Sequence, residues 1–204
     1  EDVFYLAPIE SLSIPSELID LKDGWCSCTE KLTKISVSPS NPRYFCLDEK
    51  MIIGKSSIES TIYDYLVFCV RNIQRIIIPD YITYICPHAF SESLIKTINI
   101  PSNVTKIGKN CFDKCLELNK IDFTKDSKLQ IIQESAFSFT LIESITIPSE
   151  VTKIEKSSFD GCLKLLIIEF NENSLIDLID ANLFGLPKNS ILMISGHLNN
   201  HINH

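Results

Sequence analysis

Glycine is scarce in this sequence, with six residues in a chain of 204. Loops that cradle nucleotide phosphates need several glycines within a short stretch, and the sequence has no such stretch. The G-x-S-x-G turn that carries the nucleophile of many serine hydrolases is also absent. We therefore expect neither a nucleotide-binding loop nor a hydrolase of this kind.

An excess of positive charge and long apolar runs are missing too. The chain has 19 Lys and Arg against 26 Asp and Glu, which gives a net charge of -7. This balance argues against binding to nucleic acid or to an anionic membrane. No run of 18 apolar residues occurs, so we expect no direct membrane insertion. The N-terminus, EDVFYLAPIE, lacks a basic region, and we do not expect it to be a signal peptide.

Metal-binding patterns are weak. His197, His201 and His204 would share one face of a helix, but Gly196 and the neighbouring asparagines favour a solvated tail. The Cys-x-Cys and Cys-x3-Cys spacings of the chain lack partners in zinc-binding register. No set of acid, base and nucleophile stands out. The sequence predicts no catalytic residue, no metal site and no cofactor.

The eight cysteines have two interpretations. An even number permits disulfides, whereas a chain of this size with an apolar core does not require them. Cys115 and Cys162 occupy the same position in two copies of a repeat, which favours small buried side chains with free thiols. We expect free thiols, and disulfides remain the alternative.

The chain repeats itself. The stretch from Thr97 to Leu118, TINIPSNVTKIGKNCFDKCLEL, recurs from Ser144 to Leu165 as SITIPSEVTKIEKSSFDGCLKL, and with less fidelity at 120–141 and 75–94. Self-similarity at a fixed period indicates a repeat architecture, in which each unit buries its apolar side chains against its neighbours.

Each repeat contains a short strand, in which two apolar residues flank one that faces outwards. The apolar pairs are Ile35/Val37, Ile76/Ile78, Ile98/Ile100, Ile121/Phe123, Ile145/Ile147, Ile168/Phe170 and Ile191/Met193. Several of these pairs are followed directly by proline, which cannot donate to a strand ladder and therefore ends the strand. We expect these strands to pair in parallel along one face.

A second pattern lies between the strands: an apolar residue, two others, an apolar residue, four others and an aromatic. Its phenylalanines are Phe90, Phe112, Phe137, Phe159 and Phe184, and its last copy also includes Ile176 and Ile179. Stacking of the repeats should place each Phe against the next and form a continuous aromatic ladder.

We expect one domain over residues 1–204. Residues 11–37 form the first repeat, 38–72 a β-hairpin-like insertion, 73–194 the contiguous repeats and 195–204 a C-terminal tail. The insertion begins with SPSNPRY, which is typical of turns, and Asp48-Glu49-Lys50 separates two apolar runs as a hairpin turn would.

The repeats IPSNVTKIGKNCFDKCLELNKIDF and IPSEVTKIEKSSFDGCLKLLIIEF resemble those of the BspA-like leucine-rich-repeat family, over residues 11 to 194. The resemblance implies an α/β-type repeat solenoid, a right-handed superhelix with a parallel β-sheet on its concave face. We predict irregular or short helical turns on the convex side. Members of this family are typically surface or secreted proteins of mucosal bacteria and parasitic protists, and several are regarded as adhesins.

The outward-facing strand residues are the candidate binding surface, because solenoids bind extended partners on such faces. The residues expected to face outwards are Ser36, Ile77, Asn99, Asp122, Thr146, Glu169 and Leu192. The candidate partner-binding residues are Lys96, Asn99, Lys120, Asp122, Thr146 and Glu169. They carry both signs of charge, which suits a protein partner better than a nucleic acid.

The function predicted is therefore non-enzymatic protein binding by a monomeric surface or secreted adhesin that recognises a host or matrix protein. The alternatives are an intracellular repeat scaffold and, third, a metal-dependent enzyme. Asn103-Val104-Thr105 also matches the acceptor sequence for N-glycosylation, although Ser149–Thr152 repeats the same local pattern for structural reasons.

Overall fold

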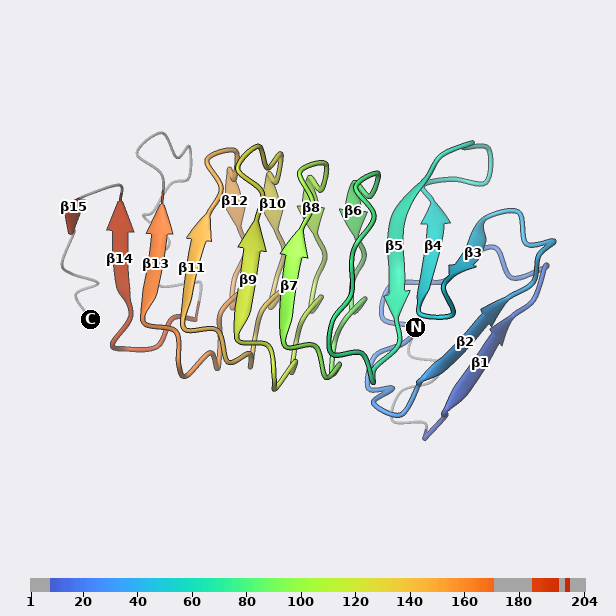
Figure 1. Ribbon diagram of the computed structural model, residues 1–204, viewed down its shortest axis with the longest axis horizontal. Coiled ribbons are helices and arrows are strands. Elements are labelled where there is room, and N and C mark those ends of the chain that lie inside the picture. Colours follow the sequence, from blue (N-terminus) through green and yellow to red (C-terminus); the bar gives the residue numbers. More distant parts are fainter. Residues whose placement is uncertain (1–7, 171–184, 195–196, 199–204) are drawn as a thin grey trace.

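The computed structural model describes residues 8–170, 185–194 and 197–198, and this part of the chain forms a β-solenoid. Figure 1 shows its turns side by side along the long axis, with the longer strands in one layer and shorter strands behind them. The repeat pattern therefore produces stacked β-coils, which confirms the predicted repeat solenoid. The α/β-type class is not confirmed, because the described residues form strands and turns without a helix.

The longer strands, here called the main strands, have the predicted parallel pairing. They are β7 (Thr97–Ile100), β9 (Lys120–Phe123), β11 (Ser144–Ile147), β13 (Ile167–Phe170) and β14 (Ile191–Ile194). The register pairs Ile98 with Ile121 and Ile145 with Ile168, and all four side chains are buried. Because strand side chains alternate between two faces, the residues between these core positions face solvent.

A second layer consists of two-residue strands. They are β6 (Tyr84–Ile85), β8 (Lys106–Ile107), β10 (Ile131–Ile132) and β12 (Lys153–Ile154), and they pair in parallel as neighbours. The isoleucine of each short strand is buried between this layer and the main strands. The core of the repeats is thus a ladder of identical apolar positions.

The connections between the two layers contain turns, and the described residues include no helix. The prediction of irregular or short helical turns opposite the main strands is therefore confirmed only in part, because turns and the two-residue strands occur there and no helix occurs in this part of the chain. The backbone explains this outcome, since Asn110 and Lys114 both have positive φ, at 52° and 56°. A left-handed residue cannot continue a right-handed helix, and each described Phe turn has one on either side of its ring.

The predicted aromatic ladder is confirmed. Phe90, Phe112, Phe137 and Phe159 are fully buried, and successive rings stack with centroids 5.0, 5.6 and 5.7 Å apart. The backbone follows the same ladder, because the N–H of Phe90 donates to the carbonyl of Cys111 and that of Phe112 to Ala136. The fifth member, Phe184, lies with Ile176 and Ile179 outside the described residues.

The N-terminal part is built differently. β1 (Ser11–Ile14) pairs in parallel with β2 (Lys34–Val37), and an antiparallel sheet follows, with β3 (Tyr44–Leu47), β4 (Met51–Lys55) and β5 (Tyr63–Cys69). β5 then pairs in parallel with β6, so this sheet continues into the layer of short strands.

Sheet β3–β5 has a core on both faces. Ile53 and Leu66 pack with the repeats, whereas Ile52 and Phe68 pack with the β1–β2 unit. There the ring centroids of Trp25 and Phe68 lie 5.4 Å apart. The inserted segment therefore joins the first strands to the repeat array through buried apolar contacts.

Two details of the predicted strand set differ from the structure. Residues 76–78 form no strand, although Ile78 is buried and Ile77 is 88% exposed as the alternation requires. The antiparallel insertion leaves this segment without a preceding main strand. In β14 the register pairs Leu192 with the core residue Ile168 and Met193 with Glu169. The side chain of Leu192 lies outside the described part of the structure, whereas Ile191, predicted as a core position, is 41% exposed.

Candidate functional site

The exposed side of the main strands carries a polar row, here called the main strand face. It consists of Asn99, Asp122, Thr146 and Glu169, one from each of β7, β9, β11 and β13, and all four are exposed. Asn99 lies opposite Asp122 in the β7–β9 register, and Thr146 lies opposite Glu169 in the β11–β13 register. The sequence predicted this row, and the structure gives its geometry.

The charges on this face are partly paired. Lys120 Nζ lies 2.7 Å from Asp122 Oδ2, and the hydroxyl of Thr146 donates to Glu169 Oε2 at 2.8 Å. Lys96 lies just before β7, where its ammonium is 3.2 Å from Glu117 Oε2. These ion pairs are exposed and contribute little to stability, so the groups can exchange partners readily.

The main strand face is interrupted between β9 and β11, which are not joined in one hydrogen-bonded sheet. A hollow of about 590 Å³ lies at this interruption. Four of the six predicted binding residues line it, namely Lys120, Asp122, Thr146 and Glu169. Lys96 and Asn99 do not line this hollow.

A second hollow, of about 600 Å³, lies between the β3–β4 hairpin and β7. Its lining includes Asp48 and Lys50 from the hairpin, Ile77, and Asn99 from β7. Ile77 is 88% exposed beside the polar row, which makes it an apolar contact point on an otherwise polar surface.

Comparison with known families identifies the repeats. The model of the BspA type leucine-rich repeat region matches residues 57–189, with six copies. The chain belongs to this family. The match begins within the inserted segment, so the first strands of this BspA-type chain lie outside it.

Three solved structures share the fold. The BspA-type chain is similar to a leucine-rich cell surface protein from Faecalibacterium prausnitzii (23% identity, TM-score 0.76), covering 93% of this chain and 49% of that one. It is also similar to the pneumococcal vaccine antigen PcpA (16% identity, TM-score 0.74; 92% of this chain and 51% of that one). A leucine-rich repeat protein from Eubacterium ventriosum matches at 20% identity with a TM-score of 0.56, over 92% of this chain and 57% of that one.

The similarities cover only part of each matched structure. The BspA-type chain spans about half the length of the structures that it matches. At these identities the likeness shows the fold. No curated protein matches the chain.

One candidate residue of this BspA-type repeat array was missed in the sequence. The turn after β9, Thr124–Lys128, has five residues, whereas Pro101–Asn103 and Pro148–Glu150 have three at the same position. Thr124 and Lys125 line the hollow between β9 and β11, and Lys125 is exposed. The sequence contained a signal for this turn, because the spacing from Phe123 to Leu129 is longer than the equivalent spacings Ile100 to Val104 and Ile147 to Val151.

Asn103 lies in the turn after β7. Its Nδ2 donates to the carbonyl of Asp80 at 2.8 Å, and Lys128 Nζ donates to its Oδ1 at 2.8 Å. The amide thus bridges the repeat before and the repeat after. Glycosylation at Asn103 stays a prediction, and a glycan there would have to share the amide with these contacts.

All eight cysteines are free, as the repeat pattern favoured. Cys115 Sγ donates to the carbonyl of Phe90 at 3.0 Å, and Cys162 Sγ does the same to Phe137. Burial raises the pKa of Cys26 and Cys115 to about 11, and that of Cys69 to about 12. Because the thiolate is the nucleophile and metal ligand, these groups are poorly suited to either role at neutral pH.

No group of three or more His, Cys, Asp or Glu within residues 8–170, 185–194 and 197–198 is arranged to hold a metal ion. His201 and His204 lie outside the described residues. The described part of the chain contains no helix that could cross a membrane.

Proposed function

We propose that this BspA-type chain binds a protein partner through its main strand face and that it has no enzymatic activity. The observation that carries the proposal is the row Asn99, Asp122, Thr146 and Glu169, which is exposed, polar and continuous with two hollows. Repeat solenoids use extended faces of this kind to bind proteins.

The chemistry of the face supports a protein partner. Carboxylates, an amide, a hydroxyl and ammonium groups lie within a few strands of one another, and Ile77 adds an exposed apolar side chain at one end. Protein interfaces combine apolar anchors with a polar surround. The net charge of -7 makes a nucleic acid a poor partner.

We further propose that the chain acts at a cell surface or in secreted form, on a host or matrix protein. Support comes from the F. prausnitzii relative, which is described as a cell surface protein, and from PcpA, described as a vaccine antigen. The adhesin role is inferred from these similarities and from the form of the face.

The first experiment measures binding of the purified chain to a panel of extracellular-matrix proteins and host-cell surfaces. The double variant Asp122→Lys/Glu169→Lys reverses both carboxylates of the face. We expect saturable binding by the parent and at least a tenfold loss in the double variant, about 1.4 kcal/mol.

The matched control is Glu59→Lys/Asp160→Lys. Both residues are exposed acids, one in the loop after β4 and the other in a Phe turn. The control should bind like the parent. Loss of binding in the control with full binding by the face variant would place the interaction elsewhere and sink the proposal.

An intracellular repeat scaffold is the second candidate, because eight free thiols persist most easily in a reducing compartment. The mass of the protein from its native source, measured after alkylation without reductant, separates the two. Eight alkylated cysteines after denaturation favour the scaffold, whereas disulfides favour the oxidising cell exterior.

A further inference from the structure

One repeat departs from the regular pattern. The turn Thr124–Lys128 has two residues more than the equivalent turns after β7 and β11. In solenoids, insertions within one repeat form loops on one face, and that face often binds the partner. The longer turn is ordered by its own contacts, because Ser127 N–H donates to Thr124 O at 3.0 Å and Lys128 Nζ to Asn103 Oδ1.

The longer turn coincides with the interruption of the main strands. β9 and β11 are not joined in one sheet, and the hollow of about 590 Å³ lies between them. Its volume is within the range of about 300–1,000 Å³ that ligand pockets occupy. The longer turn, the interruption between main strands β9 and β11, and the hollow therefore occur at one place.

Five of the fifteen residues that line this hollow carry a hydroxyl, and the others are apolar or charged. Its hydroxyl-bearing residues are Thr124, Ser127, Ser144, Thr146 and Ser149. A hydroxyl both donates and accepts, so such a lining suits the alternating N–H and C=O groups of an extended peptide.

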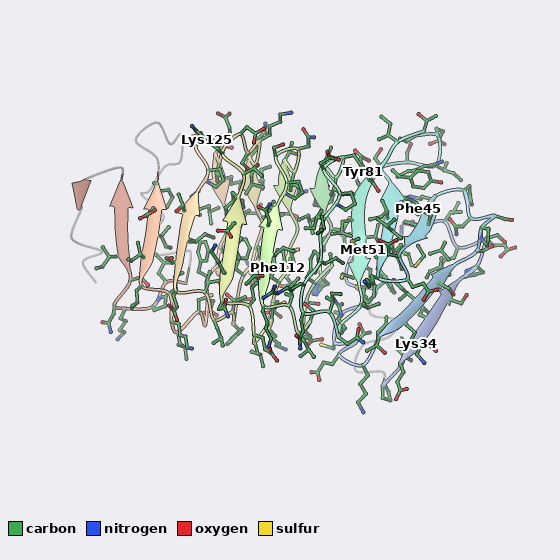
Figure 2. The ribbon with its side chains drawn as sticks, in the orientation of Figure 1. Lys34, Phe45, Met51, Tyr81, Phe112 and Lys125 are labelled. Atoms are coloured by element: carbon green, nitrogen blue, oxygen red, sulfur yellow. The ribbon has the colours of Figure 1, made fainter. Side chains whose placement is uncertain are left out.

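Two lysines line the hollow, and one of them, Lys120, is paired with Asp122, with Nζ 2.7 Å from Oδ2. Lys125 lies beyond the end of β9 and makes no ion pair within the described residues, whereas Asp122 and Glu169 lie midway along β9 and β13. Figure 2 shows Lys125 at the upper edge of the strand layer and Lys34 at the lower right, on the β1–β2 unit. A ligand that complements this arrangement carries an anion at one point and a cation at another.

We propose that the hollow between β9 and β11 binds an extended segment of a protein partner, with an acidic side chain opposite Lys125 and a basic side chain above Glu169. The inference rests on the proposed function and deepens it, since it names the segment that the face recognises. The peptide backbone contacts the hydroxyl-lined walls, and the two charged side chains fix its direction.

The test is a selection from a random dodecapeptide library displayed on phage, carried out on the immobilised full chain. Synthetic copies of the enriched peptides are then titrated by fluorescence polarisation. We expect enriched peptides to contain an acidic and a basic residue, and Lys125→Glu to weaken them at least tenfold. A peptide with its acidic residue changed to Lys should recover affinity for Lys125→Glu, which no unfolded variant would do.

The matched control is Lys34→Glu, which changes an exposed lysine of β2 and should leave binding unchanged. If the peptides bind Lys125→Glu as tightly as the parent, the hollow is not their site and the proposal is overturned. The same holds if the selection enriches no peptide. Neither result decides the proposed function, which depends on whether an intact protein partner loses binding to Asp122→Lys/Glu169→Lys.

Discussion

The guanidinium of Arg71 donates a hydrogen bond to the carbonyl oxygen of Ala89 at 3.1 Å, and both residues are buried. Within the repeats, the carbonyls at this position accept from the preceding Phe turn, as Cys111 O does from Phe90 N–H. The first Phe turn has no such predecessor. The N–H of Cys69 and the side chain of Arg71 supply the donors instead, so Arg71 caps the array.

Loss of this cap should destabilise the protein strongly. Arg71 also donates to the carbonyls of Cys26 and His88 at 3.1 Å, and its guanidinium lies 4.5 Å from the centroid of the Phe68 ring. Arg71→Met would leave buried carbonyls short of donors, and we expect the free energy of unfolding to fall by about 3 kcal/mol or more. Urea denaturation measures the change.

Arg75→Met is the control for that prediction, because Arg75 is exposed and its replacement should change stability by less than about 0.5 kcal/mol. Equal stability of the two variants would show that Arg71 does not cap the array.

We also propose that residues 1–204 unfold as one domain. We therefore expect the urea denaturation of the parent protein to show a single transition.

Removal of one ring from the aromatic ladder should be costly. Phe112 is fully buried between Phe90 and Phe137, so Phe112→Ala leaves a cavity and should lower the free energy of unfolding by about 3–5 kcal/mol. Leu163→Ala changes a side chain that is 83% exposed and serves as the control. A Phe112→Ala protein that melts like the parent would be incompatible with the stacked ladder.

Protonation of Glu92 should stabilise the fold. Burial raises the pKa of this carboxyl above its ordinary value of 4.5, and the nearby charge of Glu30 adds to the rise. The charges of Arg71 and Lys114 and a hydrogen bond from the Cys28 thiol lower the pKa, but by less. A raised folded-state pKa means that ionisation is less favourable in the folded state than in the unfolded chain. The ionised carboxylate therefore costs stability above the folded pKa, and this cost disappears as the pH falls below 4.5.

Glu92→Gln removes that ionisation, and we expect it to have a higher Tm than the parent at pH 7 and an equal Tm near pH 4. Thermal melts across this pH range, with the exposed Glu150→Gln as control, provide the test. A lower Tm of Glu92→Gln at pH 7 would mean that attraction to Arg71 and Lys114 outweighs the cost of burial.

The cysteines should differ in their reactivity towards thiol reagents. Five cysteines are buried, and burial raises the pKa of each thiol: Cys26, Cys69, Cys111, Cys115 and Cys162. We expect these five to be alkylated only after denaturation, and the partly exposed Cys28 to react first. Peptide mass mapping after timed labelling at pH 8 reports the order. Rapid labelling of the five buried cysteines in the folded protein would contradict the packing of the thiols.

The sequence by itself determined the elements that a fixed period dictates. A coil that repeats must place equivalent residues on top of one another, so the stacked phenylalanines and the buried isoleucines followed from their spacing alone. The polar row of Asn99, Asp122, Thr146 and Glu169 followed from the alternation of strand side chains.

Tertiary structure decided what depends on contacts between unlike segments. The role of Arg71 arises because residues 26 and 88–89 come together from distant parts of the chain, and no local pattern encodes that meeting. The absence of helices in the described connections follows from left-handed residues such as Lys114, a residue type with no marked preference for that conformation. The hollow beside Lys125 lies where β9 and β11 do not join in one sheet, and strand pairing is a property of two repeats together.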